Sequence, residues 1–307
     1  MNRRQFVSLT ALAAASLATP QVFLGVPMSK GTLGSFDFVF FTDTHLYPEL
    51  NADGGCAMCF KKIRSHHADF AIQGGDHTVD TLAADRRRAN MLYDLYTKTE
   101  QEIGLKVHHV VGNHDLFGID TKSGIAPGEP GYGTRMYEER FGSSTYYSFD
   151  HKGYHFIVLD SIQPVETRIW EARIDERQLA WLNHDLESTG PDTPIIVAVH
   201  VPLVTGAASY GPFIKDPNQL IIVNAHEVLP LFSARRVLAV LQGHLHVNEV
   251  VNFRSIPYVS SGAVCGNWWH GTRWGTPEGY TVVSLRDGKI SWRYETYGFK
   301  SIDPKNT

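Results

Sequence analysis

Short apolar runs recur along the chain, and in its first two thirds they are separated by stretches of helical character. Runs of about 4 to 8 apolar residues, bounded by polar or turn-forming residues, are typical of buried strands. These runs predict strands at 36–41, 69–73, 106–111, 146–150, 154–160, 195–199 and 237–241. Helices are predicted between several of them, at 56–66, 82–103, 175–187 and 226–234. Strands that alternate with helices favour an α/β architecture.

The end of the chain has a different pattern, because its strands follow one another without intervening helices. They are predicted at 247–253, 256–259, 280–285 and 289–294. Such a run predicts antiparallel pairs added to the α/β core. A chain of 307 residues suggests about two domains by length alone. The continuous series of elements instead favours one layered domain, residues 34–298, built on two sheets.

Residues 1–18 predict an export signal, with the charged pair Arg3-Arg4 followed by uncharged, apolar and small residues. The segment from Asn2 to Val7 resembles the twin-arginine motif of bacteria, although Asn2 stands where Ser or Thr is usual. The twin-arginine translocation machinery is therefore an expected partner, and the protein is expected in the periplasm or secreted. A general secretory signal and a retained anchor are the alternatives. The apolar stretch is too short to predict a stable membrane span.

Five polar clusters stand at the ends of apolar runs, and each contains side chains that bind metal ions. They are Asp43-Thr44-His45, Gly75-Asp76-His77, Gly112-Asn113-His114-Asp115, His200-Val201-Pro202 and Gly243-His244-Leu245-His246. In open α/β sheets, ligands gather beyond the carboxyl ends of the strands. Imidazole and oxygen donors suit Fe, Mn, Zn or Co, and the clusters contain no cysteine for a structural thiolate zinc site. The five clusters therefore predict a site for two metal ions and a catalytic histidine.

The series D-x-H, G-D, G-N-H-D, H and G-H-x-H, from Asp43 to His246, resembles the calcineurin-like metallophosphoesterase family. The resemblance implies a four-layer α/β/β/α sandwich with two mixed β-sheets. It also implies a metal-dependent phosphoric ester hydrolase with two divalent or mixed-valence ions, Mn, Fe, Zn or Co. The first ion would be bound by Asp43, His45, Asp76 and His246. The second would be bound by Asp76, Asn113, His200 and His244, so that Asp76 would bridge the two.

The same resemblance implies catalytic roles for two further residues. His114 would face the substrate, and it would stabilise developing negative charge or protonate the leaving oxygen, while Asp115 would hold its ring. A hydroxide bridging the metal ions would attack phosphorus in line. Phosphodiesters are the favoured substrates, with small phosphomonoesters as the alternative. A non-catalytic binding scaffold is the rival from another class, and the completeness of the ligand set argues against it.

The net charge bears on the expected partners, and the residue at position 79 bears on the expected metal ligands. The formal net charge is −4, and no basic, aromatic-interleaved track is present, so no nucleic-acid partner is expected. Purple acid phosphatases carry a tyrosine ligand three residues after the bridging aspartate, and Val79 occupies that position here. We therefore expect no tyrosinate-to-iron colour.

Several residues outside the ligand set are candidates for supporting roles. His77 and Asp80 follow Asp76 and can orient a ligand. Trp268 and Trp269 predict either the floor of a substrate pocket, with Asn267 or His270 near a phosphate, or a plug in the core. The loops at 118–133 and 205–218 are expected to rim the site. Candidates for substrate contact in or beside these loops are Tyr132, Arg135 and Tyr210.

Three cysteines are too few for a disulfide framework. Cys56 and Cys59 form a CxxC near a predicted helix start, where a thiol pKa is commonly lowered, so a redox role is one interpretation. The favoured alternative is a local disulfide or two small buried residues. Cys265 has no predicted partner.

Overall fold

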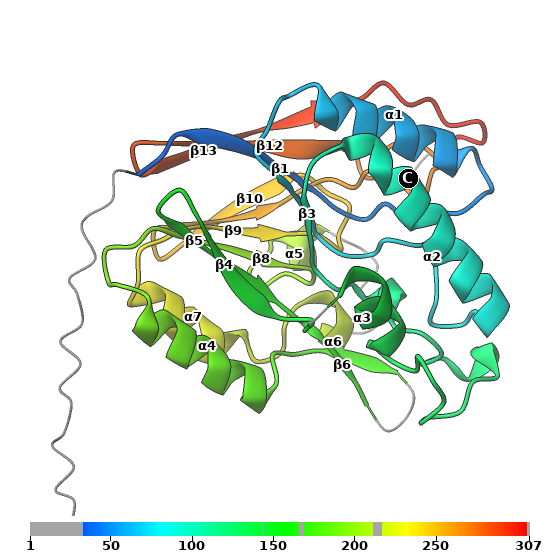
Figure 1. The fold of residues 1–307 in the computed structure, drawn as a ribbon, viewed down its shortest axis with the longest axis horizontal. Coiled ribbons are helices and arrows are strands. Elements are labelled where there is room, and N and C mark those ends of the chain that lie inside the picture. The colour runs from blue at the N-terminus through cyan, green and yellow to red at the C-terminus, as the bar shows by residue number, and fades with distance from the viewer. Residues whose placement is uncertain (1–32, 143, 166–168, 211–216, 306–307) are drawn as a thin grey trace, which may run out of the picture. The chain divides into compact units, whose positions relative to one another are not determined.

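Two mixed β-sheets lie face to face, and helices cover the outer side of each (Figure 1). The computed structural model describes residues 33–142, 144–165, 169–210 and 217–305. The first sheet has the order β13-β12-β1-β2-β3, with β1, β2 and β3 parallel. Its strands are β1 (Phe36–Phe41), β2 (Ala71–Gln73), β3 (Val107–His109), β12 (Gly279–Arg286) and β13 (Lys289–Thr296).

The second sheet has the order β10-β11-β9-β8-β5-β4, and its central strands β5, β8 and β9 are parallel. Its strands are β4 (Tyr147–His151), β5 (Tyr154–Leu159), β8 (Ile195–Val199), β9 (Val237–Gln242), β10 (Glu249–Phe253) and β11 (Ile256–Ser260). A small separate hairpin pairs β6 (Ile162–Pro164) with β7 (Trp170–Ala172).

Seven α-helices occur in the described part of the chain: α1 (Ala52–Arg64), α2 (Arg86–Glu100), α3 (Arg135–Phe141), α4 (Glu176–Ser188), α5 (Ala207–Tyr210), α6 (Pro217–Leu220) and α7 (Ala225–Ser233). Helices α1 and α2 lie over the first sheet, and α4 and α7 over the second (Figure 1). Aspartates start two of the long helices, because Asp85 and Asp175 accept backbone N–H groups of the first turns of α2 and α4.

The alternation of side chains along β1 explains why the layers stack. Phe36, Phe38 and Phe40 pack in the apolar cluster between the two sheets. Val39 and Phe41 point the other way, into the cluster that includes the buried face of α1. A strand that is buried on both faces reads as a continuous apolar run, as this one does.

The structure confirms the predicted fold class, a four-layer α/β/β/α arrangement with two mixed sheets. The sequence did not predict α3 or the β6–β7 hairpin, which are short and carry no clear periodicity. Within the described residues, no helix has both the length and the apolar character needed to cross a membrane. The predicted export signal, residues 1–18, lies outside the described residues.

Candidate dinuclear metal centre

All five predicted clusters lie at the carboxyl ends of parallel strands. Asp43 and His45 follow β1, Asp76 follows β2, and Asn113 follows β3. His200 follows β8, and His244 and His246 follow β9. Because the parallel strands of each sheet are neighbours, their carboxyl ends meet at one edge of the sandwich.

A first group of donor atoms gathers around Asp43. Its Oδ1 lies 3.2 Å from Nε2 of His246 and 3.8 Å from Nε2 of His45. The two imidazole nitrogens are 3.1 Å apart. Oδ2 of Asp76 lies 3.5 Å from Nε2 of His45. The four residues that the sequence assigned to the first ion are therefore brought together.

A second group gathers around His200 and shares the same carboxylate oxygen. Nε2 of His200 lies 3.2 Å from Oδ2 of Asp76 and 3.2 Å from Oδ1 of Asn113. The ring of His244 lies 5.2 Å from that of His200, and donor atoms of His244, His200 and Asp76 lie within 4.8 Å of one another. Oδ2 of Asp76 thus stands between the two groups, where a bridging ligand is needed.

The hydrogen bonds behind the imidazoles leave their inner nitrogens free to bind metal. Nδ1 of His200 lies 2.8 Å from the Gly74 carbonyl, and Nδ1 of His246 lies 2.6 Å from the Gly266 carbonyl. A carbonyl can only accept, so each Nδ1 donates and each Nε2 keeps its lone pair in the neutral ring. Oδ1 of Asp43 is buried, and among the described residues it has no hydrogen-bond partner, although Nε2 of His246 lies 3.2 Å away. This donor set fits two cations of the Mn, Fe, Zn or Co type.

Two motif glycines allow the ligands to approach so closely. A side chain at Gly75, which has a φ of +104°, would collide with the ring of His200. A side chain at Gly112 would collide with the backbone and the carboxylate of Asp76. The glycines of G-D and G-N-H-D are therefore packing requirements of the centre as well as turn residues.

Five of the predicted ligands have backbone conformations that L-residues rarely adopt. Positive φ values occur at Asp43 (54°), His45 (37°), Asp76 (58°), His244 (71°) and His246 (60°). Such conformations cost free energy, and they persist where the surrounding structure fixes them, commonly at functional sites. Five of the seven predicted ligands share this feature, although it also occurs at other residues of the described chain.

Burial and the charges of neighbouring side chains shift the pKa values of the predicted ligands in opposite directions. Burial alone would raise the pKa of the Asp76 carboxyl, but the imidazoles of His200 and His114 outweigh burial and hold that pKa below its ordinary range. Burial would lower the pKa of His200, but the Asp76 carboxylate raises it to about 9. Burial lowers the pKa of His45 to about 4, so this ring is neutral near pH 7.

Metal binding is expected to depend on pH through His200 and His246. The pKa of His200 is raised to about 9 and that of His246 well above its ordinary value, so both rings are protonated at pH 7, and each metal ion must displace one proton. The apparent affinity for Mn²⁺ should therefore rise by about tenfold per pH unit from neutral pH and level off above the pKa of each ring. Isothermal titration calorimetry across this range measures it. The exposed His226 supplies a control, since His226→Gln should show the same profile; an affinity independent of pH would contradict the assignment.

Asp115 is hydrogen-bonded to backbone N–H groups and to His77. Its carboxylate accepts the backbone N–H groups of Gly112, Asp76 and His77 at 2.9, 3.0 and 3.0 Å, and it lies 2.8 Å from Nδ1 of His77. These donors contact both oxygens, and no hydrogen bond between Asp115 and the His114 ring is seen in the described residues, so the role of Asp115 in holding that ring stays a prediction. Nδ1 of His114 is buried and has no hydrogen-bond partner in the described part of the chain. Asp115 ties together the two loops that carry Asp76 and His114.

The sequence suggested His77 or Asp80 as the residue that orients a ligand, and the structure distinguishes them. The His77 ring lies between Asp115 and His109, with its Nε2 3.0 Å from Nδ1 of His109. Oδ1 of Asp80 accepts the N–H of Ala83 and serves a local turn. His77 therefore supports the ligand loop through Asp115.

The two neighbouring tryptophans have different environments. The Trp268 ring is half-buried over the ligands, with its centroid 3.9 Å from that of His45 and 5.0 Å from that of His114. Trp269 is fully buried, and its Nε1 lies 3.1 Å from the carbonyls of both Thr44 and His45. The pocket interpretation suits Trp268, whereas Trp269 belongs to the core.

His270 and Asn267, the polar neighbours of the two tryptophans, were expected near a phosphate but make other contacts. Nδ1 of His270 lies 2.8 Å from the carbonyl of Asp303, and Oδ1 of Asn267 accepts a hydrogen bond from Arg273. Neither contact involves a predicted metal ligand.

Truncation of Trp269 should cost stability. Trp269→Ala removes a fully buried ring and leaves a cavity behind the first ligand loop, so we expect a loss of about 3–5 kcal/mol in the free energy of unfolding. Urea denaturation of the metal-free protein measures it. Trp268→Ala is the matched control, and it should lose clearly less because its ring is partly exposed; equal losses would contradict the core assignment of Trp269.

The cysteines and the loop residues are also placed by the structure. Cys56 and Cys59 are free and buried against the first sheet, and burial raises the pKa of both thiols well above the ordinary value, which argues against the redox interpretation. Sγ of Cys265 lies 3.7 Å from Nδ1 of His246, behind the ring. The hydroxyl of Tyr210 donates to Glu249. Tyr132 and Arg135 line a separate cavity.

Comparison with known proteins assigns the chain to a family. The model of the calcineurin-like phosphoesterases matches residues 36–248, which include every predicted ligand. The chain belongs to the calcineurin-like phosphoesterase family. The family match and the His and Asp clusters of the structure together suggest a dinuclear metal site.

Three proteins to which the chain is similar share only a small part of its sequence. A probable cyclic nucleotide phosphodiesterase from Rhodococcus erythropolis is 29% identical over 118 residues, or 38% of this chain; the match covers only 36% of that protein. A purple acid phosphatase from yellow lupin has a TM-score of 0.61 at 14% identity, over 90% of this chain and 54% of its own. A dimetal phosphatase from Danio rerio has a TM-score of 0.57 at 14% identity, over 86% and 99%. The two structures show the fold.

Proposed function

We propose that this calcineurin-like phosphoesterase is an exported phosphodiesterase that binds two metal ions at the seven predicted ligands. Asp43, His45 and His246 would hold one ion, and Asn113, His200 and His244 the other, with Asp76 between them. Two such cations would polarise the phosphoryl oxygens and supply a nucleophile from water at neutral pH.

The observation that carries the preference for diesters is the charge around the ligands. In the described part of the chain, no lysine or arginine side chain makes a hydrogen bond or ion pair with any of the seven ligands. A phosphomonoester carries more negative charge than a diester, so it has more need of such a cation. The distant relative described as a probable cyclic nucleotide phosphodiesterase supports the same choice.

The residues around the ligands would each have a separate task. His114 would face the substrate beside the first ion, where its ring lies 4.8 Å from that of His45. Trp268 would cover the ligands and exclude water from them. Asp115 would hold the backbone of Asp76 and Gly112 in place.

Hydrolysis of a chromogenic phosphodiester beside the matching monoester tests the proposal. The mature, Mn²⁺-loaded protein should cleave the diester with the higher kcat/KM. A preference for the monoester would reverse the substrate class and support the phosphatase alternative. Two bound metals without activity on either ester would favour the non-catalytic scaffold.

Export is tested separately. N-terminal sequencing of the protein from the periplasm should find a chain that begins after about residue 18, because residues 1–18 have the composition of a cleaved signal. Conversion of Arg3-Arg4 to Lys-Lys should retain the protein in the cytoplasm if the twin-arginine machinery is the partner. An intact Met1 on periplasmic protein would contradict cleavage.

A further inference from the structure

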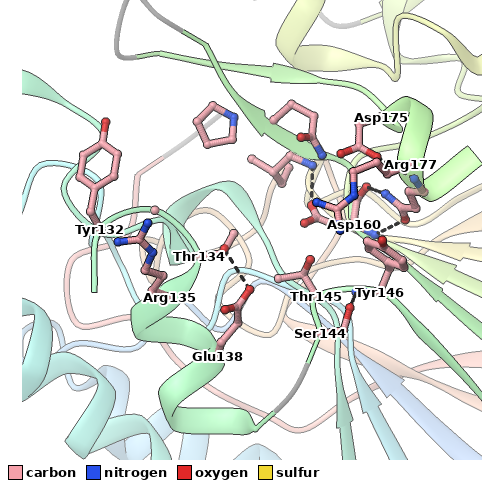
Figure 2. Close-up of a pocket in the computed structure, with 15 residues that line it drawn as sticks. Tyr132, Thr134, Arg135, Glu138, Ser144, Thr145, Tyr146, Asp160, Asp175 and Arg177 are labelled. Carbon is pink, nitrogen blue, oxygen red and sulfur yellow. Dashed lines mark hydrogen bonds between the residues drawn. The ribbon is translucent and has the colours of Figure 1, made fainter. Parts of the chain in front are cut away.

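A cavity of about 430 Å³ lies beside the second sheet, and its residues take no part in the predicted metal centre. We call it the α3–α4 cavity, because the first turns of α3 and α4 form two of its sides. Residues 144–146 before β4 and 160–164 after β5 form the others (Figure 2). Most of the side chains that line it are polar.

Two arginines reach this cavity without an acidic partner. Arg135 starts α3 and Arg177 lies in the first turn of α4, and Figure 2 shows them on different sides of the cavity. Both side chains are exposed, and in the described part of the chain no carboxylate lies within ion-pair distance of either. A guanidinium group pairs with oxyanions through two parallel hydrogen bonds, so each arginine has its donors available.

The carboxylates of the cavity already have other partners. Asp175 accepts the N–H of Gln178 as the helix cap, and Glu138 accepts the hydroxyl of Thr134. Asp160 accepts the N–H of Ile162. Burial raises the pKa of Asp160 to about 7, so near neutral pH a large share of this carboxyl is uncharged and repels an anion less.

The cavity is next to the metal centre along the edge of the sheet. Strands β5 and β8 are parallel and pair Leu159 with Val199, so Asp160 in the cavity wall follows β5 where the ligand His200 follows β8. Neighbouring strands are about 4.8 Å apart. The β6–β7 hairpin joins the two regions, because Ile162–Pro164 line the cavity and the Trp170 ring lies 5.8 Å from that of His244.

We propose that the α3–α4 cavity binds a small oxyanion, a phosphate or carboxylate group, through Arg135 and Arg177. Both side chains are long and exposed, so they can turn toward an anion in the space between them. Two sources have this chemistry. The oxyanion is either a charged group on the non-reacting end of a substrate bound at the metal centre, or a free anion in solution.

Inorganic sulfate is the first probe, used with the metal-loaded protein. We expect sulfate to raise the melting temperature with a saturable dependence, and both Arg135→Gln and Arg177→Gln to weaken its Kd by at least about tenfold. Loss of either side chain should not unfold the protein, since each is exposed and unpaired. Arg87→Gln, on the exposed face of α2, is the matched control and should keep the wild-type Kd. No rise in melting temperature, or a rise that both cavity variants keep, would overturn the proposal.

Kinetics then distinguish the two sources. If the oxyanion belongs to the substrate, Arg135→Gln should raise KM about tenfold for a diester whose aryl group carries a carboxylate and leave KM unchanged for the matching diester with an uncharged aryl group, and sulfate should compete with the carboxylate-bearing diester. If it is a free anion, sulfate should alter turnover of both diesters without competing. Only the substrate arm rests on the proposed function. Failure to cleave either diester would refute that function, and the sulfate result would stand.

Discussion

Replacement of Asp76 by alanine is expected to remove metal binding and hydrolysis together. Oδ2 of Asp76 is the oxygen that both donor groups share, at 3.5 Å from Nε2 of His45 and 3.2 Å from Nε2 of His200. Without it, two cations would face each other with no carboxylate of the protein between them. We expect a loss of activity well beyond the about 10–100-fold that removal of an outer partner causes. Metal content by mass spectrometry, and diester turnover, measure the two effects.

The control for Asp76→Ala is Asp53→Ala, which removes an exposed carboxylate at the start of α1. This variant should keep both metals and full turnover. If Asp76→Ala retained two metal ions, the bridging assignment would be wrong. If it retained one ion and lost all activity, a single-ion role for Asp76 would follow.

The sequence could predict that the candidate ligands come together, because their positions depend on strand ends. Each cluster follows a short apolar run, and parallel strands bring their carboxyl ends to one edge. Asp43, Asp76 and His200 therefore meet although they are far apart in the chain. The order of the motifs provided the rest, including the pairing of His45 with His246.

The partner of Asp115 could not be predicted, because it depends on how two loops pack. The motif places Asp115 next to His114, but neighbours in a 3₁₀ turn point in different directions. Three backbone N–H groups converge on the carboxylate from Gly112, Asp76 and His77, and two of these come from another loop. A charged group that is buried takes the donors available to it.

The different environments of Trp268 and Trp269 are a second feature that the sequence could not predict. Both residues have positive φ values, 54° and 68°, in a segment without regular secondary structure. Neither the period of a strand nor that of a helix applies there, so the pattern cannot assign a face to each ring. The α3–α4 cavity is hidden for a related reason, since α3 and β6, which are short and have no clear periodicity, form part of its lining.

His114→Ala is expected to keep both metal ions and to lose about a hundred- to ten-thousandfold in kcat. The backbone N–H of His114 donates to Oδ1 of Asp76 at 2.8 Å, and alanine keeps that contact, so the ligand loop should remain in place. What the variant loses is the His114 ring, which lies beside that of His45 and whose Nδ1 is buried with no hydrogen-bond partner among the described residues. Turnover of diesters with good and poor leaving groups measures the role. If His114 protonates the leaving oxygen, its loss should lower kcat more for the diester with the poor leaving group. If it stabilises charge, its loss should lower kcat equally for both diesters.

The Asp115→Asn variant distinguishes the role of Asp115 from the catalytic role proposed for His114. Its carboxylate holds the backbone of Asp76 and Gly112, so we expect the variant to weaken metal affinity by about 10–100-fold. Saturating metal should then restore much of its turnover, which it cannot do for His114→Ala. If His114→Ala lost its metals instead, the ring would be a ligand, as its grouping with donor atoms of His45 and Asp76 allows. If Asp115→Asn kept its metal affinity and lost only rate, Asp115 would act on the chemistry through His114 after all.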